Sequence, residues 1–116
     1  MDFDEAIKAH GAWKFKLAGY LRNPDGSLKV GDIQVDNKCQ LGQWIYGEGA
    51  KYSSFPEYQK LRTEHARFHK AAASVVQKAD SGQDTSEETA LGGKSDFSSA
   101  SSAVVAAIME MKRKAT

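Results

Sequence analysis

The chain has 116 residues, of which 41% are hydrophobic and 27% are charged, and its net charge is +1. These values are typical of one folded domain with a core of moderate size, and they exclude a disordered chain. The small net charge argues against nucleic acid or anionic lipid as a partner, because it supplies no long-range attraction to phosphate groups. We therefore expect a single domain over residues 1–116.

Two further features bear on the compartment. The longest apolar run, residues 103–109, is far shorter than the roughly 20 residues of a membrane-spanning helix, and the N-terminus has no secretory signal pattern. The only cysteine, Cys39, cannot form a disulfide within the chain. This usage favours a reducing compartment, so we expect a cytoplasmic location with no membrane segment.

The first predicted element is a helix from about Asp2 to about Leu21. Its apolar residues recur every three or four positions, and His10 falls within this stripe. The sequence Asn-Pro-Asp-Gly at residues 23–26 ends the helix with strong turn chemistry. Residues 24–38 then predict a long loop with at most a short extended piece, and a loop of that length is often functional.

Asp36 or Asn37 predicts the N-cap of a second helix, which should run through Ile45 or Tyr46 and end at the glycines that follow. If Asn37 is the cap, Cys39 lies in the first helical turn. There the unpaired backbone N–H groups and the helix dipole favour a thiolate.

A third helix is predicted to begin at Ser54 or Phe55, with Pro56 in its first turn, and to end at Ser81-Gly82. A short helix over residues 85–91 and a last helix over residues 95–113 follow. The sequence thus predicts an all-α fold, an antiparallel bundle of four main helices with an additional short helix.

The histidines and the cysteine are the candidate functional residues. A single histidine on an apolar stripe is usually a hydrogen-bonded core residue. Here His65 and His69 are one helical turn apart on one face, and His10 lies on the neighbouring helix. Together with Cys39 they form a good tetrahedral ligand set for one Zn²⁺ per chain. Because protein would fill all four positions, the pattern favours a closed site and no enzymatic activity, so we assign no catalytic residue.

Other metal sites and an enzyme active site fit the sequence less well. The stretch from His65 to His69 has Ala66 where a zinc protease needs its glutamate, and the chain lacks the inward carboxylates of a di-iron bundle. A Cys–His hydrolase with Cys39 as nucleophile is an enzyme alternative. A constitutive structural zinc module is the non-enzymatic alternative.

Three motifs resemble those of the chemoreceptor zinc-binding (CZB) domain family. They are HGAW at residues 10–13, CQLGQW at residues 39–44 and HARFH at residues 65–69. The segment WIYGEG at residues 44–49 and the Pro-Glu-Tyr opening of the third helix are also similar to the family. The resemblance extends over residues 2 to about 112, and the set of motifs in this order is more specific than any one of them.

This resemblance implies a helical bundle that binds one zinc ion through His10, Cys39, His65 and His69. It also implies a sensory or regulatory domain of bacterial signal transduction, in chemotaxis or cyclic-di-GMP signalling, that senses zinc or oxidants. The expected partners are a second copy in a homodimer and a chemoreceptor or diguanylate cyclase output module. Unlike most members, this sequence contains no output module.

Overall fold

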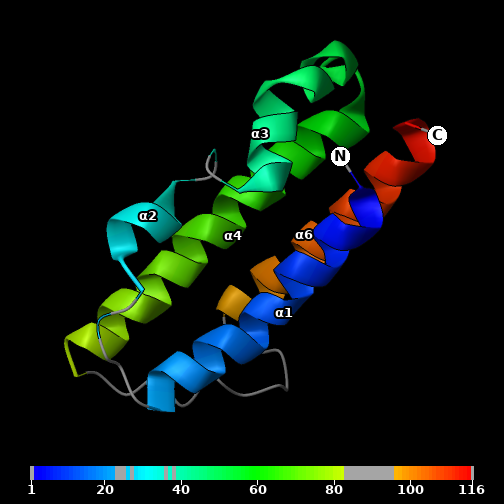
Figure 1. The fold of residues 1–116 in the computed structure, drawn as a ribbon. Helices are drawn as coiled ribbons and strands as arrows, with labels where there is room; N and C mark the ends of the chain where they lie inside the picture. Colours follow the sequence, from blue (N-terminus) through cyan, green and yellow to red (C-terminus); the bar gives the residue numbers. More distant parts are fainter. Residues whose placement is uncertain are drawn as a thin grey trace.

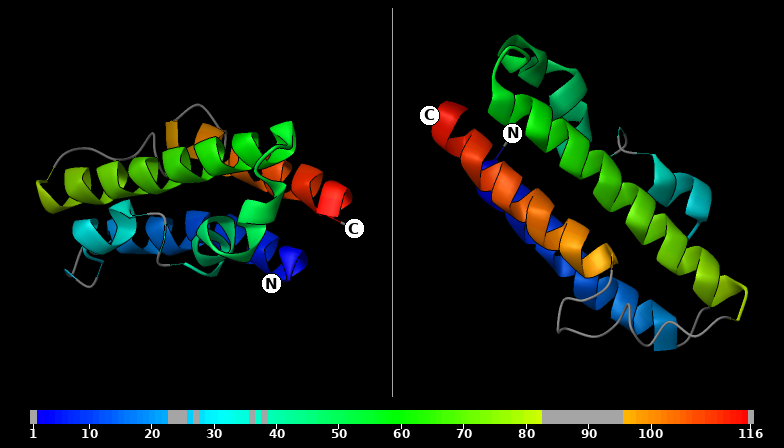
Figure 2. Two further views of the ribbon diagram at one scale, coloured as in Figure 1. Left: turned by 90° about the horizontal axis from the view of Figure 1, so that it is seen from above. Right: turned by 180° about the vertical axis from the view of Figure 1, so that it is seen from behind.

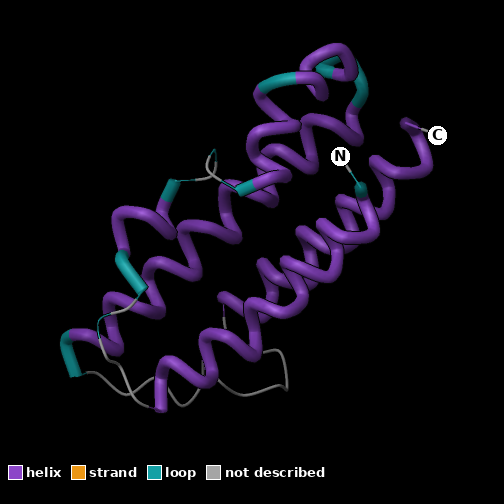
Figure 3. Tube along the Cα trace, in the orientation of Figure 1, coloured by secondary structure: helices purple, strands orange, loops and turns teal. Residues whose placement is uncertain are grey.

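The structure is a computed structural model that describes residues 2–22, 26, 28–35, 37, 39–82 and 96–115. The elements are α1 (Phe3–Arg22), α2 (Val30–Gln34), α3 (Gln40–Tyr46), the 3₁₀-helix η1 (Glu48–Tyr52), α4 (Pro56–Asp80) and α6 (Asp96–Ala115). No strand occurs among the described residues (Figure 3), which confirms the all-α class. The short helix predicted over residues 85–91 lies outside the described residues.

Three long helices, α1, α4 and α6, form the body of the molecule (Figure 1). Helix α6 packs against both α1 and α4 and runs in the opposite direction to them (Figure 2). The chain returns from the end of α1 to the start of α4 through the short helices α2 and α3. The finer prediction of four main helices is not confirmed, because among the described residues only α1, α4 and α6 are long helices.

Local chemistry explains where the long helices begin and end. The side chain of Asp2 accepts hydrogen bonds from the backbone N–H groups of Asp4 and Glu5 and so caps α1. Helix α4 begins with Pro56 after an extended Phe55. It ends before Gly82, whose φ of +80° is a conformation that favours glycine. The predicted bounds of the third helix are thus confirmed.

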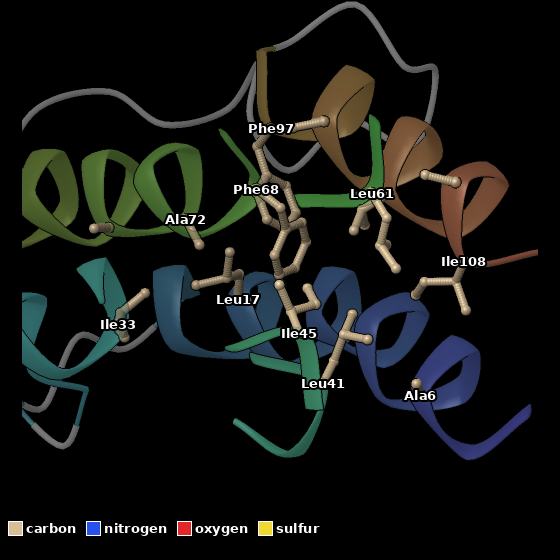
Figure 4. Packing of buried hydrophobic residues seen from close by; sticks show 14 of the residues in the cluster. Ala6, Leu17, Ile33, Leu41, Ile45, Leu61, Phe68, Ala72, Phe97 and Ile108 are labelled. Carbon is tan, nitrogen blue, oxygen red and sulfur yellow. The ribbon is translucent and has the colours of Figure 1, made fainter. Parts of the chain in front are cut away.

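The hydrophobic core lies between the long helices and α3 (Figure 4). Phe68 and Leu61 of α4 are fully buried and share this core with Ile108 of α6. Leu41 and Ile45 bring α3 into the same cluster. The apolar face of α3 therefore fixes the position of the residue that precedes it, Cys39.

Two predictions for the segment between α1 and α4 were wrong. Residues 24–38 were expected to be loop or extended chain, yet they contain α2. Its single turn is stabilised because Ile33 is buried against the core and the carbonyl of Lys29 accepts hydrogen bonds from the N–H groups of Asp32 and Ile33. The next helix begins at Gln40 rather than after Asp36 or Asn37.

Candidate metal centre

His10, Cys39, His65 and His69 converge on one point. Helix α1 supplies His10, the N-terminus of α3 supplies Cys39, and one face of α4 supplies His65 and His69. One ligand atom from each residue lies within 4.8 Å of the ligand atoms of the other three. The histidines are 4%, 0% and 6% exposed respectively, whereas Cys39 is half-buried. The structure thus brings together all four residues that the sequence singled out.

The distances between these atoms suit a tetrahedral ion. Cys39 Sγ lies 3.2 Å from His65 Nε2 and 3.6 Å from His69 Nε2. The two Nε2 atoms of His65 and His69 are 3.0 Å apart. Tetrahedral zinc with ordinary bond lengths separates two nitrogens by about 3.3 Å and sulfur from nitrogen by about 3.6 Å. The three donor atoms are therefore spaced almost as the edges of a zinc tetrahedron.

Backbone carbonyls fix which nitrogen two of the histidines present to the centre. His10 Nδ1 donates to the carbonyl of Ala6 at 2.8 Å, and His69 Nδ1 donates to the carbonyl of Ile33 at 2.9 Å. A carbonyl oxygen can only accept, so Nδ1 carries the proton and Nε2 keeps its lone pair. This arrangement is typical of metal-bound histidines, whose second nitrogen is held by a carbonyl or carboxylate.

The electrostatics keep His10 and His65 neutral. Burial, with smaller contributions from the neighbouring imidazoles of His69 and His10, lowers the pKa of His65 to about 3. Burial also lowers the pKa of His10, and only its hydrogen bond to Ala6 opposes this change. Neutral imidazole is the form that binds metal. Near pH 7 these two side chains therefore need lose no proton before binding.

His65 carries a further sign of a ligand site. Its Nδ1 is fully buried and has no hydrogen-bond partner among the described residues. Buried polar atoms without partners are rare because desolvation costs about 1–3 kcal/mol for each. The cluster is thus unfavourable as a plain polar core.

Cys39 itself is the N-cap of α3, a role that the sequence analysis missed when it placed this residue in the first turn. Its Sγ accepts a hydrogen bond from the N–H of Gly42 at 3.3 Å. Donation by a backbone N–H stabilises a thiolate over a thiol. Cysteine is a poor sequence signal for an N-cap, so Asp36 and Asn37 looked more suitable.

Comparison with known proteins agrees with this geometry. Residues 10–76, more than half of the chain, match the sequence model of the chemoreceptor zinc-binding domain family. The chain belongs to the chemoreceptor zinc-binding domain family. The match contains all four clustered residues, and the cluster is compatible with a zinc site. No curated protein and no solved structure matches the chain.

The described part of this CZB domain has no helix that is both long and apolar enough to cross a membrane. The CZB match ends within α4, so it covers α1 from His10 onward, the short helices and most of α4. The family signature is therefore concentrated around the metal centre rather than in α6.

Proposed function

We propose that this CZB domain binds one Zn²⁺ through His10, Cys39, His65 and His69 and acts as a sensory or regulatory domain in bacterial signal transduction. The observation that carries the proposal is the convergence of three histidines and the only cysteine, from three helices, with Nε2 lone pairs of His10 and His69 directed by backbone carbonyls. Four protein donors leave no place for a reacting water, so the proposed role is not catalytic.

Zinc bound here would tie the N-terminus of α3 to α1 and α4. Cys39 is the ligand most open to change, since it is half-buried while the histidines are buried. Oxidation of its thiolate by hypochlorous acid, with chloride as the leaving product, would give a sulfenic acid, a weaker metal ligand. Zinc loss or this oxidation would free α3 to move, which is the proposed signal.

The proposed output is a change in how the domain contacts a second copy and a signalling module. Phe15 of α1 is 69% exposed and Met109 of α6 is 48% exposed, so both long helices present large apolar side chains to solvent. We expect a two-fold homodimer, the commonest assembly. A chemoreceptor or diguanylate cyclase module, in the same chain or another, is the proposed partner.

The alternative is a constitutive structural zinc module with no sensory role. Both functions require the same ligands, and they differ in what happens when zinc leaves. A sensor should exchange zinc with a chelator while it remains folded, whereas a structural module should unfold as zinc is withdrawn. The Cys–His hydrolase would instead keep its activity without zinc.

The test combines metal analysis with oxidant titration. Purified protein should contain one zinc per chain, and Cys39→Ser should bind zinc more weakly while it keeps its helical circular dichroism. Hypochlorous acid should release zinc from the wild type before methionines and tryptophans are modified. A matched control, Met109→Leu, removes an exposed oxidisable side chain outside the centre and should leave this release unchanged. A metal-free protein would refute the zinc site, and late release would refute the redox role alone.

A further inference from the structure

A cavity of about 320 Å³ opens beside the metal centre. Cys39 and His69 are among the residues that line it. Its remaining walls include Trp13, Lys16, Leu28, Lys29, Asp32 and Val35. We call it the Cys39 cavity. Its volume is at the lower end of the range for small-molecule sites.

The Cys39 cavity gives a small molecule a route to the sulfur. Lys16, Lys29 and Val35 are exposed at its walls, so it communicates with solvent. His10 and His65, by contrast, are buried and are not among the residues that line it. A reagent or competing ligand that enters here therefore meets Cys39 and His69 rather than His10 or His65.

Among the described residues that line the cavity, positive charges outnumber negative ones. Lys16 and Lys29 contribute two ammonium groups, and Asp32 contributes one carboxylate. The Nζ atom of Lys16 lies 4.3 Å from the centroid of the Trp13 ring, a cation–π contact that holds the ammonium group at the cavity. A net charge of one sign around a concave opening raises the local concentration of oppositely charged molecules.

We propose that the Cys39 cavity is a binding site for small anionic thiol-directed molecules, and that Lys16 and Lys29 select them by charge before they react with Cys39. The inference deepens the proposed function and rests on it, because it takes Cys39 as the responsive ligand. For an anionic disulfide or thiosulfonate, the Cys39 thiolate attacks one sulfur and forms a new S–S bond. The old bond to that sulfur breaks, and the departing group leaves with the electron pair as a thiolate or sulfinate.

The experiment compares two probes of similar size and opposite charge on the metal-free, reduced full chain. The anionic probe is 2-sulfonatoethyl methanethiosulfonate, and the cationic probe is 2-(trimethylammonium)ethyl methanethiosulfonate. Modification rates of Cys39 are measured by intact mass at low and high salt. The ratio of anionic to cationic rate should exceed the ratio for the urea-unfolded chain by about threefold or more at low salt. It should approach the unfolded value at high salt, where screening is strong.

Matched variants assign this preference to the cavity. Replacement of both Lys16 and Lys29 by Gln should lower the rate ratio at least to that of the unfolded chain. The control replaces Lys8 and Lys51 by Gln, which removes the same charge from exposed positions that do not line the cavity. This control should keep the wild-type ratio.

Zinc content of the same proteins separates the two proposals. If both double variants change the rate ratio equally, or if the folded and unfolded chains share one ratio, the cavity does not select by charge and the inference is wrong. If the preference is found but wild-type protein binds no zinc, the cavity proposal stands for the thiol while the proposed zinc function fails.

Discussion

The interface of α6 with α1 and α4 differs in kind from the region around Cys39. The α6 interface buries apolar and small residues along two long helices, including Val104, Ile108 and Met111. The Cys39 region also buries apolar side chains of its two short helices, but it adds three histidines, a thiol and the Ile33 carbonyl that holds His69. Burial of apolar side chains is favourable without any ion or partner. Buried nitrogen and sulfur lone pairs that converge on one point are costly unless a metal ion or a hydrogen-bond donor pairs with them. In our proposal, the first region stabilises the fold and the second responds to zinc or oxidants.

The largest expected effect is on the Cys39 region. His65→Ala should weaken zinc binding by about a hundredfold or more, because loss of outer hydrogen bonds to a metal ligand alone costs 10–100-fold. Competition with a chromophoric chelator measures this affinity. His10 and His65 lie on different helices but bind the same ion in our proposal, so His10→Ala should have a similar effect. Zinc affinity that survives both changes would contradict the ligand assignment.

The next effect is on the α6 interface. Ile108→Ala removes a fully buried side chain from α6 and should lower the free energy of unfolding by about 2–5 kcal/mol. Urea unfolding of the metal-free protein measures it. Cys39→Ser, the matched change in the other region, should cost far less in the same assay. Equal losses would mean that the two regions do not divide stability and response as proposed.

Acid should lower the free energy of unfolding through the Cys39 region, where His65 is buried. The folded-state pKa of His65 is lowered to about 3, so protons bind the unfolded chain first as the pH falls below about 6.5. The free energy of unfolding of the metal-free protein should therefore be highest above pH 6.5 and decrease toward pH 4. Urea midpoints at several pH values check the sign, and His65→Gln should flatten the profile. A wild-type midpoint that rises on acidification would contradict the burial of a neutral His65.

A smaller effect is expected where α3 meets η1. A Cβ atom on Gly49 would lie 2.8 Å from Trp44 Cε3 and 2.8 Å from the Trp44 carbonyl oxygen. Gly49→Ala should therefore lower the free energy of unfolding by about 1–3 kcal/mol and shift the tryptophan fluorescence. Gly11→Ala is the control, because a Cβ there meets nothing within 4 Å. An unchanged free energy of unfolding for Gly49→Ala would show that Trp44 can move aside at no cost.

Much of the fold could be predicted from the sequence because its signals are local. Apolar residues that recur every three or four positions predicted α1, α4 and α6. Pro56 and Ser81-Gly82 marked the two ends of α4. The spacing of His65 and His69 placed both rings on one helical face. The four residues of the candidate centre were thus identified from type and spacing, aided by the resemblance to the CZB family.

Other features depended on contacts between distant segments. Helix α2 has one turn and forms because the core buries Ile33, which no pattern within residues 24–38 reveals. The carbonyl of Ile33 then orients His69, 36 residues away along the chain. The cavity beside Cys39 likewise combines side chains of α1, α2 and α4. Sequence alone determined which residues could bind a metal, and the tertiary structure decided which of their atoms face one another, because direction and burial are set by packing between helices.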